Sequence, residues 1–285
     1  MNDRYIVTAT VRRDGSSNFG AGNRYGTFPS ASVAWRLSEE KFIKDLELFS
    51  NLKLRAGWGQ TGNAGNGTNL SIAQLSSANA MYWFFNGSSV INGAGIAQQK
   101  EIDTNLKWET NEQTNIGIDF AFMNNELSFS VDYFIRNSKD LLIYRQIRPS
   151  TGFTTVYTNA GHIRNKGFEL EVTTQNLTGK LKWSTSLNVS YNQNKVLSLG
   201  DDNSTVFTGY DSTTQVFMVG QPLRSFYMYD AVGVYQTQAD LQKYPVMQNT
   251  KVGDVRYRDA NGDGIISDSD RTLMGKPDPD YTFGI

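Results

Sequence analysis

Residues 113–136 read QTNIGIDFAFMNNELSFSVDYFIR, and this stretch decides the fold. Apolar and largely polar residues alternate on both sides of a break at Met123-Asn124-Asn125. Strands place successive side chains on opposite faces, so the period of two predicts two strands, each with one apolar and one largely polar face. Asn tolerates the left-handed backbone of tight turns, and Asn124-Asn125 therefore predicts a hairpin. The apolar face consists of Ile116, Ile118, Phe120, Phe122, Leu127, Phe129, Val131, Tyr133 and Ile135.

The same unit repeats further along the chain. Phe168, Leu170 and Val172 alternate with polar residues, a break follows at Gln175–Gly179, and Leu181–Tyr191 alternates again. The last strand is expected to be ten or more residues long, whereas strands in soluble proteins average about 5–6 residues. Membrane-spanning strands need roughly 9–11 residues, apolar toward lipid and polar toward the lumen. The repeat therefore favours a transmembrane barrel.

The alternative is a soluble antiparallel sandwich, which alternates in the same way but turns its apolar face inward. In a barrel wall the apolar side chains face outward in a band about 25 Å tall. In a sandwich they are buried in a core. The residues that separate the two readings are Ile118, Phe120, Phe129, Val131, Leu187 and Val189.

Connection lengths also favour the barrel. Short connections at Met123–Asn125 and Gln175–Gly179 alternate with long ones at Gly59–Asn111 and Asn192–Gly220. Outer-membrane barrels combine short periplasmic turns with long outer loops. The predicted fold class is all-β, with little helix: a partial antiparallel transmembrane β-barrel with long outer loops. Strand-like sequence reaches both termini, so we expect an incomplete wall with two free edges.

Composition limits the function classes. The chain has 285 residues, of which 19% are charged and 12% aromatic, with a net charge of −1 and no cysteine. This net charge gives no electrostatic reason to expect nucleic-acid binding. The absence of cysteine excludes a cysteine nucleophile, a cysteine-ligated zinc site and disulfides. No apolar run approaches the about 18 residues of a membrane helix.

The N-terminus lacks a basic region followed by an apolar core, so no signal peptide is predicted. A barrel protein without one is not exported, and Tyr281–Ile285 looks like a strand cut short. We therefore expect the chain to be an internal piece of a longer polypeptide.

Two short helices are expected between strands. Ser38-Glu39-Glu40-Lys41 resembles a helix cap, and the apolar residues after it, Phe42 to Phe49, are expected to pack locally. A membrane-surface role is disfavoured because the segment lacks a basic face. The second helix is expected within Thr237–Tyr244.

The sharpest local motif is the acidic loop Asp259–Asp270. It places oxygen-bearing residues at positions one, three, five, nine and twelve, with Gly264 at six, a spacing that wraps a loop around a hard cation such as calcium. Position twelve carries Asp270, where an EF-hand has glutamate, so binding would be weak. The alternative is a turn cluster in which Asx side chains bond their own backbone. The candidate calcium ligands are Asp259, Asn261, Asp263, Ile265, Ser267 and Asp270.

No catalytic constellation is evident, so the chain is not expected to be an enzyme. His162, the one histidine, is interpreted as structural, and Glu169 and Glu171 as charges that face the lumen. The aromatic run Tyr82–Phe85 lies in a long loop. It suits stacking on a sugar ring or partner protein, or packing of the loop onto the barrel rim.

Seven stretches together resemble one family, the SusC/RagA-type TonB-linked outer-membrane proteins, and specifically the C-terminal part of their barrel. No single stretch is diagnostic, but all seven occur in the expected order. They are Arg13–Gly20; Phe28–Trp35 with Ser38-Glu39-Glu40; Leu52–Asn63; Trp108-Glu109 with Asn115-Ile116-Gly117; Asn165–Glu169; Asp259–Arg271; and Gly275–Tyr281.

The resemblance implies that residues 1–285 belong to the barrel of a TonB-dependent receptor in the outer membrane of a Gram-negative bacterium, with plug and final strands absent. It implies active import of oligosaccharides or peptides. The implied partners are a SusD-like surface lipoprotein, the TonB complex acting through the plug, and outer-membrane lipid. The rival is a soluble calcium-binding all-β carbohydrate-binding or adhesin module.

Overall fold

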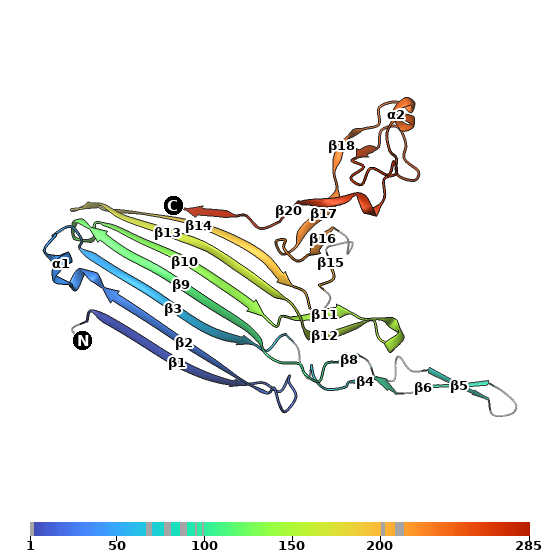
Figure 1. Cartoon of the computed structure of the whole chain (residues 1–285), viewed down its shortest axis with the longest axis horizontal. Helices are drawn as coiled ribbons and strands as arrows, with labels where there is room; N and C mark the ends of the chain where they lie inside the picture. The colour runs from blue at the N-terminus through green and yellow to red at the C-terminus, as the bar shows by residue number, and fades with distance from the viewer. Residues whose placement is uncertain are drawn as a thin grey trace. The chain divides into compact units, whose positions relative to one another are not determined.

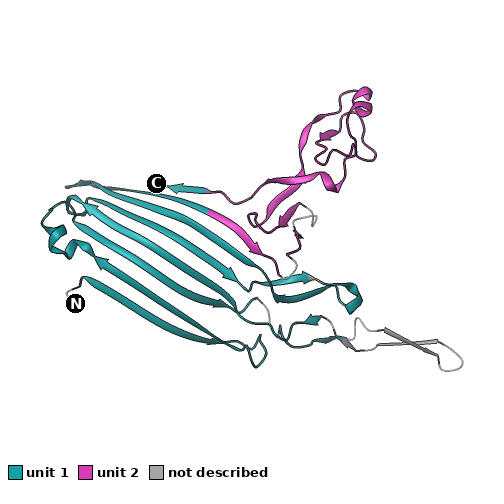
Figure 2. Ribbon diagram, in the orientation of Figure 1, with its two compact units in different colours: residues 1–192, 281–285 teal, residues 193–280 magenta. Residues whose placement is uncertain are grey.

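The computed structural model describes residues 3–66, 70–76, 81–85, 90–94, 96–98, 100–200, 203–208 and 214–285. The chain divides into two compact units (Figure 2). The first contains Met1–Asn192 and Tyr281–Ile285, and the second, here called the loop unit, contains Gln193–Asp280. The region expected to be one barrel segment thus carries a separate compact unit between its last two strands.

The first unit is built on one eight-stranded sheet, here called the strand wall (Figure 1). Two of its strands, β13 and β14, are 17 residues long, which confirms the expectation of strands longer than those of soluble proteins. In spatial order the strands are β1 (Tyr5–Gly15), β2 (Tyr25–Arg36), β3 (Asn51–Asn63), β9 (Glu109–Phe122), β10 (Leu127–Lys139), β13 (His162–Thr178), β14 (Lys182–Ser198) and β21 (Tyr281–Gly284).

The sheet is open, because β1 and β21 lie at its opposite edges and do not pair with each other. The neighbours from β1 through β13 pair antiparallel, as do β14 and β21. The prediction of an incomplete wall with two free edges is confirmed.

Connections within the first unit are sorted by end. At one end lie the turn between β9 and β10, the short β13–β14 turn, and the β2–β3 connection with its helices η1 (Leu37–Glu39) and α1 (Lys41–Lys44). The long connections from β3 to β9 and from β10 to β13 lie at the other end (Figure 1). The predicted asymmetry is confirmed for the β9–β10, β13–β14 and β3–β9 connections, whereas the β1–β2 connection (16–24) lies at the long-connection end and is shorter than the β2–β3 connection (37–50).

The β9–β10 turn is the 3₁₀ turn η2 (Met123–Asn125), with φ of 51°, 53° and 69° at its three residues. The left-handed backbone predicted at Asn124 and Asn125 is confirmed. Met123 adopts it as well, which residues other than glycine and asparagine rarely do.

The two faces of the wall differ as predicted. The outer face carries the apolar residues, and many are exposed: Val33 to 51%, Ile116 to 59% and Phe168 to 43%. The six residues that separate barrel from sandwich are all partly exposed, and none belongs to the buried core. No second sheet covers them among the described residues. The apolar face therefore points outward, and the sandwich interpretation is wrong.

Buried apolar residues of the first unit gather instead beside the long connections. Phe19 and Leu106 are almost fully buried. Trp108 contacts the Phe19 ring at 5.4 Å and the Phe28 ring at 5.6 Å between centroids. Gly62 makes room for Phe28, because a Cβ at Gly62 would lie 2.0 Å from the phenyl ring. This cluster anchors the long connections to the wall.

The first expected helix differs from its prediction. It is only a 3₁₀ turn and a four-residue α-helix, without a side-chain cap. Instead of capping, Glu40 accepts hydrogen bonds from the Trp35 indole (3.2 Å) and the Tyr5 hydroxyl (3.0 Å). These donors lower the pKa of Glu40 below its usual range. Phe42 is 60% exposed, so the expected local packing of this residue is wrong.

The strands also extend into the connections expected at Gly59–Asn111, Gln175–Gly179 and Asn192–Gly220. β3 continues to Asn63, β9 begins at Glu109, β13 continues to Thr178 and β14 continues to Ser198. Glycine and asparagine in these stretches suggested loops. In the wall, small residues are favoured because large side chains of neighbouring strands lie across them.

The smaller elements of the first unit form three short sheets at the long-connection end. They are β4 (Leu75–Ser76) with β7 (Ala97–Gln98); β5 (Met81–Phe85) with β6 (Val90–Ala94); and β8 (Glu101–Ile102) with β11 (Leu142–Gln146) and β12 (Thr155–Asn159), together with the 3₁₀ turn η3 (Pro149–Thr151).

The loop unit has an ordinary buried core, including Val216, Tyr235 and Ile266. Its helix begins at the Thr237 N-cap with a complete capping box, which confirms the second predicted helix. No helix in the described part of the chain is long and apolar enough to cross a membrane. The elements are β15 (Val206–Thr208), β16 (Gln215–Phe217), β17 (Ser225–Tyr229), β18 (Ala231–Val234), α2 (Gln238–Lys243), β19 (Val255–Tyr257), η4 (Asp268–Asp270) and β20 (Arg271–Gly275).

Candidate functional site

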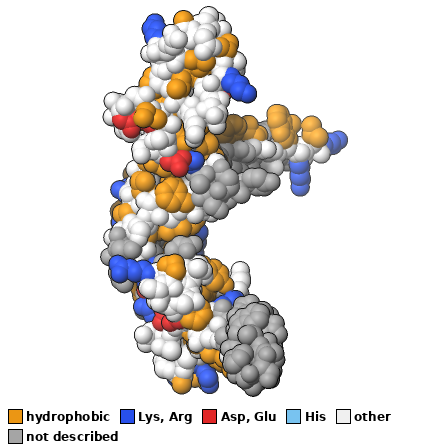
Figure 3. All heavy atoms as spheres, turned by 90° about the vertical axis from the view of Figure 1, so that its right-hand side faces the viewer, with side chains coloured by type: hydrophobic (Ala, Val, Ile, Leu, Met, Phe, Trp, Pro, Cys, Tyr) orange, Lys and Arg blue, Asp and Glu red, His pale blue; other side chains and the backbone are white. Residues whose placement is uncertain are grey.

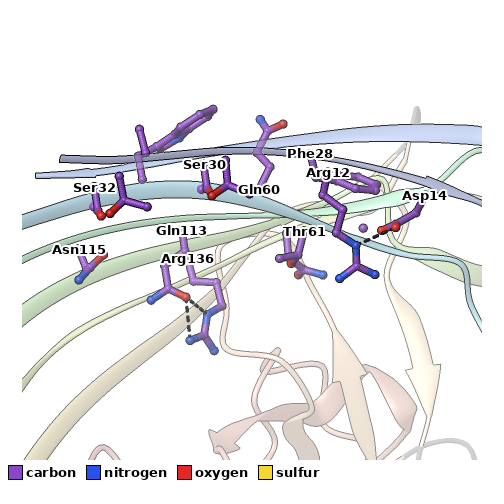
Figure 4. Close-up of a pocket in the computed structure, with 18 residues that line it drawn as sticks. Arg12, Asp14, Phe28, Ser30, Ser32, Gln60, Thr61, Gln113, Asn115 and Arg136 are labelled. Atoms are coloured by element: carbon purple, nitrogen blue, oxygen red, sulfur yellow. Dashed lines mark hydrogen bonds and ion pairs between the residues drawn. The ribbon is translucent and has the colours of Figure 1, made fainter.

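The candidate site is a groove on the inner face of the wall, the face opposite the apolar band. Antiparallel register brings inner positions of five strands into one row: Thr10, Ser30, Gly59, Gln113 and Arg136. Directly opposite residues in such a sheet lie about 4.5–5.5 Å apart. Residues distant in sequence thereby form one continuous polar surface (Figure 4).

The groove has a volume of about 740 Å³, which is within the usual range of ligand sites. Hydroxyl and amide side chains are the most frequent in its lining, beside apolar surface that includes Phe28. Such groups exchange hydrogen bonds with water or with a polar solute without presenting a strong charge. The polar lining residues on the inner face are Thr8, Thr10, Arg12, Asp14, Ser30, Ser32, Thr61, Asn111, Gln113, Asn115 and Arg136.

The two arginines of the groove are differently placed. Arg12 donates from Nε to Asp14 at 2.7 Å, so the Asp14 carboxylate compensates its charge. Arg136 donates from two nitrogens to the Gln113 amide oxygen, at 3.2 and 3.1 Å, and has no carboxylate partner among the described residues. Arg136 is therefore the groove cation that retains most capacity to attract an acceptor from a solute.

A charged cluster lies on the inner face nearer the short connections. Arg55 on β3 binds Asp119 on β9 through two nitrogens (2.8 and 2.7 Å) and Asp132 on β10 at 2.8 Å. Lys53 also reaches Asp119, at 2.9 Å. Gly117 allows this bridge, because a Cβ there would lie 2.3 Å from Asp132 and 2.8 Å from Arg55. The Arg55 cluster ties three strands together.

Sequence reasoning placed these charges on the polar face but did not pair them. The β9–β10 register could be predicted from the sequence, because the predicted Asn124-Asn125 turn sets Gly117 opposite Asp132. The β3–β9 register could not be predicted, because more than forty residues separate these two strands. Glu169 and Glu171, expected to face the lumen, do lie on the inner face, opposite Asp132 and Ser130.

In the acidic loop Asp259–Asp270, the predicted ligand oxygens accept backbone hydrogen bonds. Asp259 accepts from Gly262 and Gly264, at 2.7 and 2.8 Å. Asp270 is fully buried and accepts from Ala260, Asn261 and Ser267. These donors, Ser267 first, lower the pKa of Asp270.

The other predicted ligands lie close by. Asn261 and Asp263 form successive Asx turns, with Asp263 accepting from the Ile265 amide at 2.9 Å. The φ of 84° at Gly264 provides the expected sharp turn. Across the described residues, no group of three or more acidic or histidine side chains is arranged as a metal site. The backbone contacts are those of the turn-cluster alternative, and calcium binding stays a prediction.

Two further sequence predictions can be placed. His162 lies at the start of β13 with its Nε2 atom 3.4 Å from the Asn137 amide oxygen, which fits a structural role. The side chains of Tyr82–Phe85 lie outside the described residues, although the backbone of Met81–Phe85 forms β5.

Viewed from the end of the long connections, hydrophobic side chains and charged side chains of both signs are interspersed with uncharged polar groups and backbone (Figure 3). A mixed surface fits the part of a membrane protein where its strands emerge into water. An open wall of long strands, apolar outside and grooved and polar inside, defines a segment of an outer-membrane β-barrel.

The family follows from comparison with known proteins. The model of the family described as "TonB dependent receptor-like, beta-barrel" matches residues 1–283, and the chain belongs to this family. Its members reside in the outer membrane of Gram-negative bacteria and are receptors and transporters, not enzymes, as predicted.

The relatives support this assignment. The chain is 36% identical over 292 residues to TonB-dependent receptor P3 of Formosa agariphila, covering 99% of the chain and 28% of P3. It is 33% identical over 294 residues to TonB-dependent receptor SusC of Bacteroides thetaiotaomicron, with the same shares covered. The chain thus spans less than a third of these relatives.

Solved structures show the same fold. The structure of the RagAB peptide transporter matches 99% of the chain and 29% of the solved chain, with a TM-score of 0.76 and 23% identity. The RagAB peptide importer in its "open-open" state matches the same shares with a TM-score of 0.77 and 25% identity. The predicted SusC/RagA resemblance is confirmed.

Proposed function

We propose that this chain forms part of the wall and outer connections of an active importer that carries oligosaccharides or peptides across the outer membrane. The observation that carries the proposal is the polar groove of about 740 Å³ on the inner face of an outward-apolar wall. Its hydroxyl and amide groups complement both sugar hydroxyls and peptide amides. Arg136 adds a cation available to a carboxylate or another acceptor.

The relatives support the same activity. SusC is named a TonB-dependent receptor, and RagAB is described as a peptide transporter and peptide importer. We infer from them that the working protein couples to the TonB complex through a plug and binds a SusD-like surface lipoprotein at its long connections. We assign no residue in the described part of the chain to energy coupling.

The rival function was a soluble calcium-binding all-β recognition module. That function needs the apolar strand residues to be buried, whereas Val33 and Ile116 are 51% and 59% exposed. Soluble proteins rarely expose continuous apolar surface on this scale. The exposed band therefore favours the importer.

Uptake measurements test the proposal. Cells producing the whole protein are offered fluorescent oligosaccharides and oligopeptides, and uptake is compared with cells that lack it and with cells whose proton-motive force is dissipated. We expect uptake of one ligand class that requires both. Energy-independent uptake, or no loss of uptake without the protein, would contradict the proposal.

Neighbouring residues on β2 supply a matched pair of variants. Ser32 lines the groove, and Val33 lies on the outer face. Ser32→Trp narrows the groove and is expected to reduce uptake severalfold, whereas Val33→Trp places an apolar ring in lipid and leaves uptake unchanged. Equal effects of the two variants would show that the groove is not the route.

A further inference from the structure

A group of basic residues lies on the outer face, where the apolar band ends toward the long connections. Lys166 pairs in register with Ile135, Arg164 with Asn137, and Lys139 with His162. All lie on the same face as Tyr133 and Phe168, because an even number of positions separates Lys139 from Tyr133 and Arg164 and Lys166 from Phe168. We call Lys139, Arg164 and Lys166 the basic patch.

The positive charge of the patch is incompletely matched. Lys139 donates to Glu112, which also accepts from the Trp58 indole at 3.1 Å. Arg164 donates from Nε to the neutral Asn137 side chain at 2.8 Å. Neither Arg164 nor the exposed Lys166 has a carboxylate partner in the described part of the chain.

The remaining charges nearby do not neutralise the patch. Asp140, the other acidic side chain beside His162, is paired with Lys107 at 3.0 Å. The patch therefore presents three cations against the single carboxylate of Glu112.

Membrane geometry determines what the patch meets. Ile135 on β10 and Phe168 on β13 end the apolar band next to it, and Phe168, 43% exposed, pairs with Tyr133, 48% exposed. Aromatic residues at this position mark the membrane–water boundary. Since long connections are extracellular in outer-membrane barrels, the patch lies at headgroup level in the outer leaflet.

We propose that the basic patch binds a phosphate on the headgroup of an outer-leaflet glycolipid, with the acyl chains of that lipid against Tyr133, Ile135 and Phe168. Same-face residues two apart on a strand lie roughly 7 Å from each other, so phosphate oxygens can reach Arg164 and Lys166 together. The guanidinium of Arg164 suits bidentate contact with phosphate, and Lys166 adds a point charge. This lipid site does not depend on the imported cargo.

Lipid titration of the purified whole protein tests the site, with bound lipid counted by native mass spectrometry. The probes are lipopolysaccharide and the same lipopolysaccharide with its phosphates removed. We expect the phosphorylated form to bind more tightly to the native protein. The double variant Arg164→Gln/Lys166→Gln is expected to bind it about 30-fold more weakly, from the attraction typical of two cations near anionic headgroups.

Two controls isolate the phosphate contact. Lys41→Gln/Lys182→Gln removes the same charge at the short-connection end and is expected to leave binding unchanged. Arg164→Lys/Lys166→Arg keeps the charge and most of the binding. Equal binding of both probes by the native protein overturns the proposal, even where the double variant fails to fold. So does undiminished binding by a folded double variant.

Discussion

The strand wall and the loop unit solve the problem of apolar surface in opposite ways. In the loop unit, Val216 and Ile266 are 0% and 3% exposed, as in any water-soluble core. In the wall, Val33 and Ile116 are 51% and 59% exposed, and the polar residues occupy the inner face. The same residue types are thus stabilised by protein in one unit and by lipid in the other.

Charges follow the same contrast. In the wall, Arg55, Asp119 and Asp132 have side chains 28%, 20% and 22% exposed and satisfy one another across three strands. In the loop unit, Asp270 is fully buried and satisfied by backbone N–H groups. A strand wall can satisfy charges through register, whereas a loop must satisfy them through its own backbone.

The largest expected effect comes from charging the outer face. Ile118→Arg, which lies opposite Val131 inside the apolar band, places a guanidinium in the bilayer and is expected to destabilise the folded protein by about 2–4 kcal/mol. Asn115→Arg, three positions earlier on the same strand, turns the arginine into the groove and is expected to cost less than about 1 kcal/mol. The measurement is the urea midpoint of the whole protein in phospholipid vesicles. Equal costs at the two positions would break the distinction between faces.

The Arg55 cluster gives the next largest effect. Arg55→Ala leaves Asp119 and Asp132 without their shared cation and is expected to cost about 1–3 kcal/mol, moderated by partial exposure. Arg12→Ala, on the same face but with a side chain 74% exposed, is expected to cost clearly less, because solvent screens its pair with Asp14. The same urea measurement compares them, and a larger loss at Arg12 would show that register-built pairing is not what stabilises the wall.

A pH experiment tests whether backbone N–H groups stabilise the buried Asp270 carboxylate in the loop unit. Backbone donors lower the pKa of Asp270 in the folded state, so its contribution is present above the unfolded value, about 3.9, and is lost as pH falls through the folded pKa. We expect amide exchange within 260–270, corrected for intrinsic rates, to accelerate below about pH 4. Asp270→Asn should expose these amides at neutral pH and flatten the acid response. An unchanged acid response in the variant would assign it to other groups.

The smallest effect concerns the predicted calcium ligands. A loop that already satisfies its oxygens with backbone donors should bind calcium weakly, with a Kd of roughly 10⁻⁴–10⁻³ M. Asp259→Ala is expected to weaken binding further, and Asp278→Ala, outside the loop, to leave it unchanged. Titration calorimetry measures both, and absence of heat with the native protein would end the calcium hypothesis.

Much of the wall could be predicted from the sequence, because the apolar residues of its outer face contact lipid and need no specific protein partner. Alternation through Ile116–Ile135 needs no partner to be interpreted, and Asn124-Asn125 carries its own turn signal. The helix within Thr237–Tyr244 was likewise predicted, and the structure adds the capping box of Thr237 and Asp240. In each case, residues close in sequence contain the information.

The rest depends on residues far apart in sequence. The groove row from Thr10 to Arg136 exists only after β1, β2, β3, β9 and β10 are in register. Glu40 fails to cap its helix because Trp35 and Tyr5 capture its carboxylate. Sequence pattern shows which face a side chain occupies, but its partner on that face is fixed by pairing across long connections.

Single-cysteine labelling tests the orientation of the wall most directly, because this chain has no native cysteine. Cysteines introduced one at a time from Ser128 to Tyr133 in the membrane-embedded protein are probed with a water-soluble and a lipid-soluble thiol reagent. We expect strict alternation, with positions 129, 131 and 133 reacting from lipid and positions 128, 130 and 132 from water. Uniform reaction with either reagent along this strand would contradict a lipid-facing wall around an aqueous lumen.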